Sequence, residues 1–230
     1  MRDCENAIES YLEGKPLQTP SKILIAALVE FGNAPVRNVG TRDIARRAGV
    51  NIAAISYYFD GKDDLYAELI DQIIAYFNRM AGSFHARLEA LVKNPSKREA
   101  KALVYDYVEW RLASINGHSA AQNEVIKSIV SIVAREELNN TPMFKKIHAG
   151  VIEWSNRVFS QPFKIIYGDD IDEERARILA LALSGALIRF CVVTDSIKES
   201  MGWSSMAENG CAKIRDAIFF VLDNMFRGYV

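Results

Sequence analysis

The sequence has few cysteines and no closely spaced pair of them. Its three cysteines are Cys4, Cys191 and Cys211, an odd number without a CxxC spacing. Secreted scaffolds that are held together by disulfides carry a dense and even set of cysteines. The pattern therefore argues against a disulfide scaffold and favours a reduced, intracellular protein.

An apolar run long enough to cross a membrane is also missing. The most apolar stretch, residues 178–193, has 16 residues and is interrupted by Ser184 and Arg189, whereas a transmembrane helix needs about 20 apolar residues. The stretch MRDCENAIES lacks the apolar segment of a signal peptide. We therefore expect a soluble, cytoplasmic protein that has no membrane partner.

Sequence motifs of enzymes and metal sites are missing as well. The sequence contains no GxSxG, GxGxxG, GxxxxGK[ST] or HExxH motif. The histidines, His85, His118 and His148, are isolated in sequence. Folding could bring two of them together as metal or ligand contacts, but we interpret each as an ordinary core or surface residue. We predict no enzymatic activity, no catalytic residue, no cofactor and no metal site.

What the sequence does contain is helical periodicity, in nearly every segment longer than ten residues. The chain has 230 residues, of which half are apolar and a quarter charged, enough for one domain or two. The helix predicted over 142–167 has a kink at Pro162. The predicted helices cover 3–14, 20–31, 41–48, a short segment after the cap Asn51, 62–92, 97–115, 121–138, 142–167, 172–196 and 204–228.

Residues 41–65, TRDIARRAGVNIAAISYYFDGKDDL, have the pattern of two short helices joined by a tight turn. Gly49 would supply the positive φ angle of that turn. Five basic residues against two acidic ones leave residues 36–62 with a net charge of +3, in a chain whose formal charge is −1. The predicted inner side of the motif consists of Ile44, Ala45, Ala48, Val50, Ile55, Phe59 and Leu65.

The side chains outside that inner core suit contact with DNA. Thr41 and Lys62 lie at predicted helix N-termini, where backbone N–H groups favour a phosphate, and Thr41 can cap its helix. The hydroxyls of Tyr57 and Tyr58 can donate to phosphates. Arg42 is placed to reach the edge of a guanine. We therefore predict a DNA-binding surface on this motif.

Ile52, Ala53 and Ala54 raise a question, because consecutive apolar residues are unusual on a short surface helix. In the major groove of DNA, thymine methyl groups present apolar surface that such side chains can contact, and small alanines allow a close approach. The alternative is that these residues pack inside with Ile55. On the sequence alone both interpretations stay open.

The motif resembles the DNA-binding domain of the tetracycline-repressor (TetR) family. The matching pattern is Thr41-x-x-Ile44-Ala45-x-x-Ala48-Gly49-Val50, followed by Ile55-x-Tyr57-Tyr58-Phe59-x-x-Lys62-x-x-Leu65. The resemblance implies phosphate contacts from Thr41, Tyr57, Tyr58 and Lys62, and base contacts from Arg42, Ile52, Ala53 and Ala54. Ser56 departs from the family pattern, where an aromatic residue is most often found, so that one phosphate contact is shortened or lost.

The resemblance implies an all-α homodimer with an N-terminal three-helix helix-turn-helix domain and a C-terminal helical ligand-binding and dimerisation domain. The stretches NIAAISYYF, LSGALIRF and REELNNTP are also similar to the CecR-like subgroup of the family, which suggests control of toxic-compound sensitivity and efflux. We assign 1–19 to an N-terminal extension, 20–65 to DNA binding and 66–230 to ligand binding and dimerisation. Because the extension is acidic, we expect it to fold back or stay mobile and not to enter the minor groove.

The last two predicted helices are apolar on more than one side. In the final one, Phe219 and Phe220 widen a stripe that already contains Ile214, Ile218 and Leu222. Such a face fits contact with a second subunit, and the alternative is a fully internal helix. We predict a homodimer that forms through these two helices.

A small-molecule effector is expected among the central helices. The candidate wall residues, which are more often core residues, are Phe77, Phe84, Tyr107, Trp110, Met143 and Trp154. The leading prediction is a ligand-responsive repressor that binds double-stranded, palindromic operator DNA as a homodimer. The alternative is a helical small-molecule binding protein whose helix-turn-helix has lost DNA binding.

Overall fold

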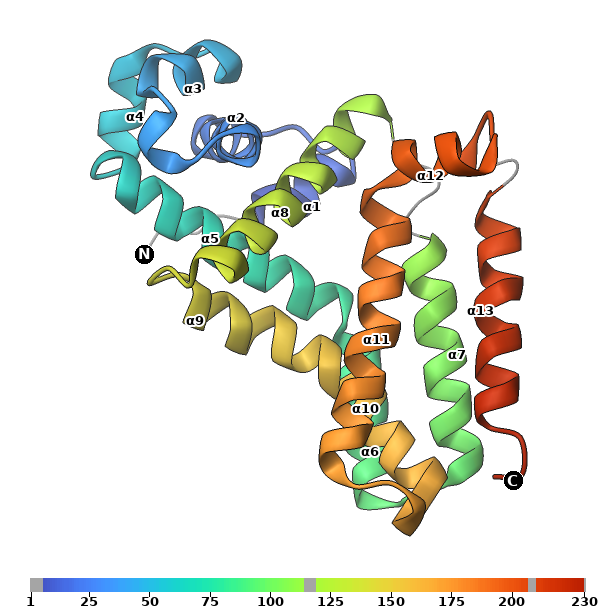
Figure 1. Ribbon diagram of the computed structural model, residues 1–230. Helices are drawn as coiled ribbons and strands as arrows, with labels where there is room; N and C mark the ends of the chain where they lie inside the picture. Colours follow the sequence, from blue (N-terminus) through green and yellow to red (C-terminus); the bar gives the residue numbers. More distant parts are fainter. Residues whose placement is uncertain (1–5, 114–118, 207–209, 230) are drawn as a thin grey trace. The chain divides into compact units, whose positions relative to one another are not determined.

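The computed structural model describes residues 6–113, 119–206 and 210–229, without the side chains of residues 191 and 192. These residues form helices joined by short turns and no strand (Figure 1). The predicted all-α class is therefore confirmed.

The chain divides into two compact units. Unit 1 comprises residues 1–80 and 118–151, and unit 2 comprises residues 81–117 and 152–230. The polypeptide thus passes from one unit to the other after residues 80, 117 and 151. These units are defined by how the chain packs, whereas the boundary predicted after residue 65 separates DNA binding from ligand binding. That functional boundary stays a prediction.

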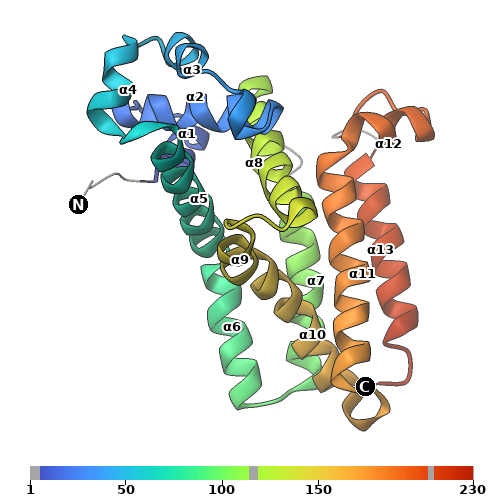
Figure 2. The same cartoon turned by 60° about the vertical axis from the view of Figure 1, so that its left-hand side comes forward.

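Unit 1 contains the predicted helix-turn-helix. Its helices are α1 (Ala7–Leu12), α2 (Thr19–Asn33), α3 (Thr41–Ala48), α4 (Ile52–Tyr58), α5 (Gly61–Met80), α8 (Ala120–Asn139) and α9 (Phe144–Ile147), with a 3₁₀ turn at Val36–Asn38. Figure 2 shows α2, α3 and α4 grouped at the start of α5. Ile44, Ala45, Ile55, Phe59 and Leu65 are buried there as predicted.

Helix α8 stabilises the C-terminal end of α2 through hydrogen bonds. The guanidinium of Arg135 on α8 donates to the carbonyl oxygens of Phe31, Gly32 and Ala34, at 2.8 Å for Gly32 and 3.0 Å for Ala34. These carbonyls lie at the C-terminus of α2, where no further helical N–H groups are available, and a positive charge is favourable at that end. Gly32 also approaches α8 so closely that a Cβ atom would lie 2.4 Å from Ser128 Cβ.

The described part of the N-terminal extension folds back into unit 1. The side-chain oxygen of Gln72 on α5 accepts a hydrogen bond from the backbone N–H of Ala7, at 2.8 Å. The backbone oxygen of Gln72 accepts a second one from the side-chain amide of Asn6, also at 2.8 Å. On the other side of α1, the Gln122 side chain donates to the Leu12 carbonyl at 2.6 Å. Residues 6–12 are therefore tied to both α5 and α8.

Unit 2 consists of α6 (Gly82–Lys93), α7 (Lys97–Ala113), α10 (Glu153–Tyr167), a 3₁₀ turn (Gly168–Asp170), α11 (Glu173–Val192), α12 (Thr194–Met201) and α13 (Cys211–Met225). Its core contains fully buried aromatic and aliphatic residues from several of these helices, among them Val104, Phe159, Phe163, Ile166 and Leu222. Among the described residues, no single helix is long and apolar enough to cross a bilayer; α11 and α12 meet the two criteria only when they are taken together, across an 82° bend.

Two of the long predicted helices are divided in the structure. The helix predicted over 62–92 breaks at Ala81, which precedes Gly82, a poor helix former. The helix predicted over 142–167 is interrupted by a π-helical turn at His148–Ile152, while α10 continues through Pro162. The break therefore lies ten residues before the proline that was expected to kink the helix.

The last two predicted helices are shorter than expected. The one predicted over 172–196 ends at Val192, and a separate helix, α12, begins at Thr194. The final helix spans Cys211–Met225 in place of 204–228. Gly202, in a left-handed conformation with φ of 65°, ends α12.

Candidate nucleic-acid interface

The turn between α3 and α4 has the predicted geometry. Gly49 has a φ of 67°, in the left-handed region that glycine adopts without a steric penalty. The side-chain oxygen of Asn51 accepts a hydrogen bond from the backbone N–H of Ala53 at 2.9 Å and so caps α4. Ile44 and Ile55, both buried, hold the inner sides of the two helices together.

The outer side of α4 is exposed and largely apolar. Ile52 is 44% exposed and Tyr57 is 81% exposed, and Ala53 and Ser56 are exposed beside them. Ala54 and Tyr58 are half-buried, and the two tyrosine rings meet edge to face at 4.9 Å. Because Ile52 and Ala53 face outward, the alternative in which the whole apolar stretch is core is wrong for these two residues.

The structure corrects the predicted cap of α3. The N-cap residue is Gly40, which has no capping side chain, and Thr41 is the first residue of the helix, half-buried. Glycine gives the first turn no side-chain acceptor for its N–H groups. Thr41 therefore remains positioned for a phosphate contact but does not cap its own helix.

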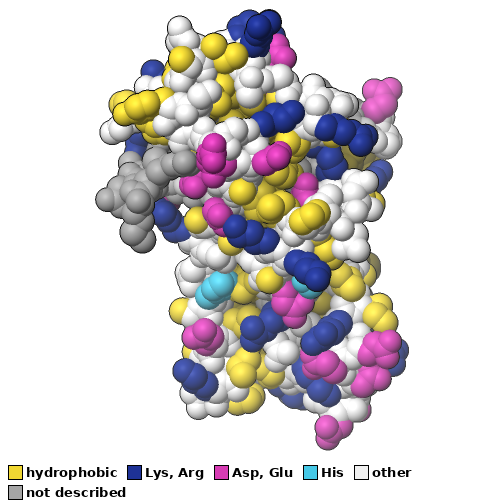
Figure 3. Space-filling model, turned by 90° about the vertical axis from the view of Figure 1, so that its left-hand side faces the viewer, with side chains coloured by type: hydrophobic (Ala, Val, Ile, Leu, Met, Phe, Trp, Pro, Cys, Tyr) yellow, Lys and Arg dark blue, Asp and Glu magenta, His cyan; other side chains and the backbone are white. Residues whose placement is uncertain are grey.

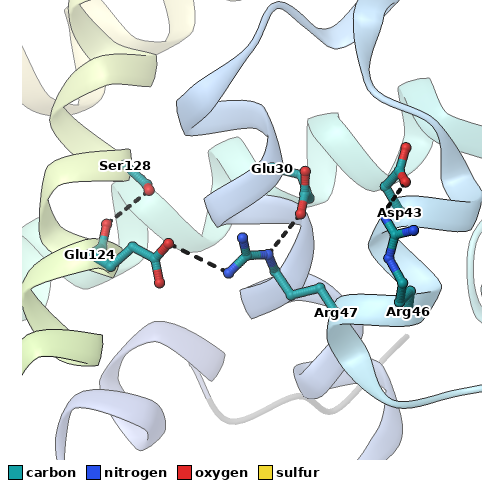
Figure 4. A network of polar contacts seen from close by, with 6 residues as sticks. All are labelled: Glu30, Asp43, Arg46, Arg47, Glu124 and Ser128. Carbon is teal, nitrogen blue, oxygen red and sulfur yellow. Dashed lines mark hydrogen bonds and ion pairs between the residues drawn. The ribbon is translucent and has the colours of Figure 1, made fainter.

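Two of the five basic residues that concentrate charge here are paired with carboxylates (Figure 4). Arg47 bonds Glu30 on α2 at 2.7 Å and Glu124 on α8 at 3.5 Å, and Arg46 pairs with Asp43. The hydrogen bond to Glu30 raises the pKa of Arg47, with Glu124 acting in the same direction. The predicted positive charge of the motif is therefore partly neutralised within unit 1.

Among the described residues, Arg37 and Arg42 are the exposed cations of this group for which no carboxylate partner is seen, and Arg42 is the one that lies on α3. Its side chain is exposed, and within the residues that the structure describes it pairs with no carboxylate. Figure 3 shows the side of the molecule that carries α4, where exposed apolar side chains lie beside both basic and acidic ones. The surface is thus an apolar helix with a few cations beside it, and not a broad basic patch.

Lys62 lies at the N-terminus of α5, where its ammonium group and a nearby backbone N–H already have hydrogen-bond partners within the protein. Its ammonium donates to the Val39 carbonyl at 3.0 Å, and the side chain of Asp64 accepts the backbone N–H of Asp60 at 2.9 Å. A carboxylate at a helix N-terminus competes with a phosphate for the same N–H groups. The phosphate contact of Lys62 stays a prediction.

Four of the six predicted ligand-contact residues come together in unit 2. We call Phe84, Tyr107, Trp110 and Trp154 the aromatic cluster. The Tyr107 ring lies 5.3 Å from the rings of Phe84 and Trp110 and 5.9 Å from that of Trp154. The other two, Phe77 and Met143, are half-buried and belong to unit 1.

A polar groove of about 430 Å³ also lies in unit 2, between α10 and α11. It contains none of the predicted ligand contacts. Its lining consists of Glu153, Asn156, Arg157, Ser160, Gln161, Glu173, Arg177 and Leu181. This groove therefore offers charges of both signs, in contrast to the aromatic cluster.

The sequence analysis missed His85 as a companion of the aromatic cluster. Its ring lies 4.4 Å from that of Trp154. The Nε2 atom of His85 and the Nε1 atom of Trp154 are both buried, and neither has a hydrogen-bond partner among the described residues. Burial lowers the pKa of His85, an effect opposed by Glu89 and strengthened by Arg157. The sequence spacing gave no sign of this pairing, because the two residues lie on different helices.

Helices α11 and α13 carry both buried and exposed apolar residues. Ile214, Ile218 and Leu222 are buried within unit 2, whereas Phe220 is 69% exposed and its neighbour Val221 is also exposed. On α11 the exposed apolar side chains are Ile178, Leu181 and Ile188. The alternative of a fully internal final helix is therefore wrong.

The remaining histidines and cysteines offer no site among the described residues. No group of three His, Cys, Asp or Glu side chains there could hold a metal ion. Cys211 is a half-buried cysteine. Cys4, His118 and the side chain of Cys191 lie outside the described residues.

Comparison with known proteins connects both units to regulators. Residues 23–69 match the model of bacterial regulatory proteins of the tetR family, and residues 111–228, half of the chain, match the C-terminal domain of the HTH-type transcriptional dual regulator CecR. The CecR protein of Shigella flexneri is 25% identical over 211 residues, which cover 92% of each chain. A solved structure described as that of a transcriptional regulator from Pseudomonas aeruginosa PAO1 has a TM-score of 0.55 and 15% identity, over 92% of this chain and 93% of that one.

Proposed function

The chain belongs to the TetR family of DNA-binding transcriptional regulators and has a CecR-type C-terminal domain, and on this basis we propose that it is a ligand-responsive repressor which binds a palindromic operator as a homodimer. The observation that carries the proposal is the exposed outer side of α4, where Ile52, Ala53 and Tyr57 face solvent while Ile55 anchors the helix. A helix of this kind enters the major groove.

In this proposal α4 reads DNA through apolar contacts and a small number of polar ones. Ile52, Ala53 and Ala54 contact thymine methyl groups, and Arg42 reaches a guanine. Phosphates are held by Thr41, Tyr57, Tyr58 and Lys62. Ser56 is too short to replace an aromatic side chain at a phosphate, so we assign more of the backbone affinity to the tyrosines.

Dimerisation is proposed through α11 and α13. Each of these helices has several exposed apolar residues, Ile178, Leu181 and Ile188 on α11 and Phe220 and Val221 on α13, and exposed apolar surface of this kind often marks an interface. In the proposed dimer the two α4 helices enter successive major grooves, which are about 34 to 36 Å apart. The proposed effector binds in unit 2 at the aromatic cluster and favours a conformation in which that spacing is wrong. We place the protein in the cytoplasm, where its operator is.

The test is selection of binding sites from a random double-stranded DNA library, followed by anisotropy titration of the selected site at two salt concentrations. We expect a palindrome whose half-sites contain A·T pairs opposite α4, bound with a steep salt dependence. If no sequence is enriched even at low salt, the protein is the alternative, a small-molecule binding protein whose helix-turn-helix has lost DNA binding.

Two variants distinguish recognition of bases from contact with phosphates. Arg42→Ala is expected to relax the preference at one base pair by about 1 to 3 kcal/mol, while Lys62→Ala weakens all sequences alike and lowers the salt slope by about one. Equal loss of discrimination in both variants would contradict the assigned roles. Because the Shigella flexneri relative is called a dual regulator, a promoter fused to a reporter should be read for both repression and activation.

A further inference from the structure

Two buried polar atoms lie at the aromatic cluster of unit 2, one on its member Trp154 and one on the neighbouring His85. Neither His85 Nε2 nor Trp154 Nε1 has a hydrogen-bond partner within the part of the chain that the structure describes. Buried polar groups are almost always paired, and an unpaired one costs about 1 to 3 kcal/mol. Two of them on adjacent rings, 4.4 Å apart, therefore indicate a place where a partner from outside the chain belongs.

The surroundings of these atoms define the chemistry of that partner. Phe84 and Tyr107 are buried and lie within ring-contact distance of each other and of Trp110, and the Tyr107 ring also contacts Trp154. Aromatic faces and edges favour a flat apolar body. Arg87 and Arg111 lie over the outer rings, 6.0 Å from the centroid of Phe84 and 5.9 Å from that of Trp110. The Nε2 atom of His85 and the Nε1 atom of Trp154 are themselves buried, and a net charge placed beside them would be costly.

The two nitrogens restrict the polar group that the partner can carry. The indole of Trp154 can only donate, so it requires an acceptor. Burial favours the neutral imidazole of His85, and a neutral imidazole donates from one nitrogen and accepts at the other. A hydroxyl oxygen can serve both atoms in either tautomer, and a carbonyl oxygen can serve both when Nε2 carries the proton.

We propose that His85 and Trp154 form the polar end of the effector site, which takes an uncharged, planar aromatic molecule carrying a carbonyl or hydroxyl oxygen. This proposal rests on the proposed function, because it names the class of effector to which the regulator responds. The ligand's oxygen bonds the two nitrogens, and its ring packs against the aromatic cluster.

The position of the two residues in the chain also suggests how binding is transmitted. His85 lies in the first turn of α6, which follows the passage into unit 2 after residue 80. Trp154 is the second residue of α10, directly after the π-helical turn His148–Ile152 and the passage after residue 151. A ligand that separates the two rings must move the starts of both helices, and π-helical turns often mark functional sites where a helix can shift its register.

The experiment uses the full-length protein and two probes of the same shape, acetophenone and ethylbenzene, which differ in the carbonyl group. Binding is followed by NMR of the indole N–H signals, of which the chain has three. Loss of one signal in Trp154→Phe assigns it. We expect acetophenone to shift the Trp154 signal and to bind roughly fivefold more weakly to Trp154→Phe and to His85→Phe, the value of one hydrogen bond of about 1 kcal/mol.

The controls make the result specific to the two nitrogens. Ethylbenzene should bind all three proteins with affinities within about twofold of one another, because it makes no hydrogen bond. Trp203→Phe, which changes a tryptophan outside the aromatic cluster, should bind both probes like the wild type. Circular dichroism establishes that each variant is folded before its affinity is compared.

The outcomes separate this proposal from the proposed function. If acetophenone fails to bind, or loses no more affinity than ethylbenzene in the two variants, the polar pair is not a ligand site, whether or not the protein binds its operator. If acetophenone binds as expected and weakens operator binding by the wild type but not by Trp154→Phe, both proposals stand. If it binds as expected and the wild type selects no operator, the site stands and the repressor proposal fails.

Discussion

The two units differ in whether their buried polar side chains have hydrogen-bond partners. In unit 1, Arg135, Gln72 and Glu136 are each tied to partners on other segments, and Glu136 accepts hydrogen bonds from the hydroxyls of Tyr66, at 2.6 Å, and Thr141. In unit 2, His85 and Trp154 each have a buried nitrogen that finds no hydrogen-bond partner in residues 6–113, 119–206 and 210–229. Among the described side chains, the buried nitrogen and oxygen atoms without a partner thus lie in unit 2 and not in unit 1, which is why we propose the ligand site at the aromatic cluster.

The largest effect is expected where unit 1 depends on a single charged side chain. Arg135→Met removes the donor that serves three carbonyl oxygens at the end of α2, and should lower the free energy of unfolding by about 2 to 3 kcal/mol, because hydrogen bonds to charged groups are strong and water replaces only part of them. Amide hydrogen exchange of α2 measures the loss. Arg98→Met, on the exposed surface of unit 2, should change it by less than about 0.5 kcal/mol, and a similar loss in both variants would contradict the comparison.

A steric test of the same contact comes second. A glycine inside a helix is usually improved by alanine, yet in Gly32→Ala the new methyl would meet Ser128 at 2.4 Å for Cβ and 2.6 Å for Cα. We expect a loss of about 1 to 3 kcal/mol from overpacking, measured by urea denaturation followed by circular dichroism. At Gly82 no heavy atom lies within 4 Å of an added Cβ, so Gly82→Ala should be neutral or stabilising. If Gly32→Ala caused no loss of stability either, α2 and α8 would be able to move apart without cost.

The third test concerns unit 2, where the substitution is expected to leave the free energy of unfolding unchanged or to raise it. His85→Phe removes a buried atom without a partner and keeps a ring against Trp154, so the ligand-free protein should be as stable as the wild type or more stable by about 1 kcal/mol. Tryptophan emission follows this unit selectively, because all three tryptophans, Trp110, Trp154 and Trp203, lie in it. A loss above that size would mean that His85 is a structural residue.

The smallest effect is expected on the surface of unit 1. Glu124→Gln weakens one of the two ion pairs of Arg47, at a distance of 3.5 Å between partly exposed side chains. Exposed pairs contribute about 0.2 to 1 kcal/mol and less at high salt. Urea titrations at low and high salt should show a small difference that disappears at high salt; a persistent loss would place this pair among the structural contacts.

Local features of the sequence predicted unit 1 well. The conformation of Gly49, the cap at Asn51 and the inner residues Ile44 and Ile55 depend on neighbours in the chain, so their roles follow from the sequence pattern. The family resemblance of residues 41–65 was confirmed by the match over residues 23–69. The residue roles toward DNA stay predictions, because no side chain by itself identifies the base that it contacts.

Features that depend on distant segments could not be predicted. The contacts of Arg47 with Glu124 and of Arg135 with the end of α2 join residues 77 to 104 positions apart, and periodicity carries no information about them. The aromatic residues were chosen by type, which is why Phe77 was grouped with Phe84 although they belong to different units. The unpaired nitrogen of His85 became visible only when the burial of its atoms was known.

The dependence of α2 on Arg135 has a consequence for how the protein is made. Synthesis runs from the N-terminus at about 5 to 20 residues per second, and the residue that completes the end of α2 follows Phe31 by 104 positions. All of α6 and α7, which belong to unit 2, are synthesised in between. We therefore expect the nascent chain to hold an incomplete DNA-binding region until α8 has left the ribosome, so that a prematurely terminated product lacking α8 would not occupy the operator stably.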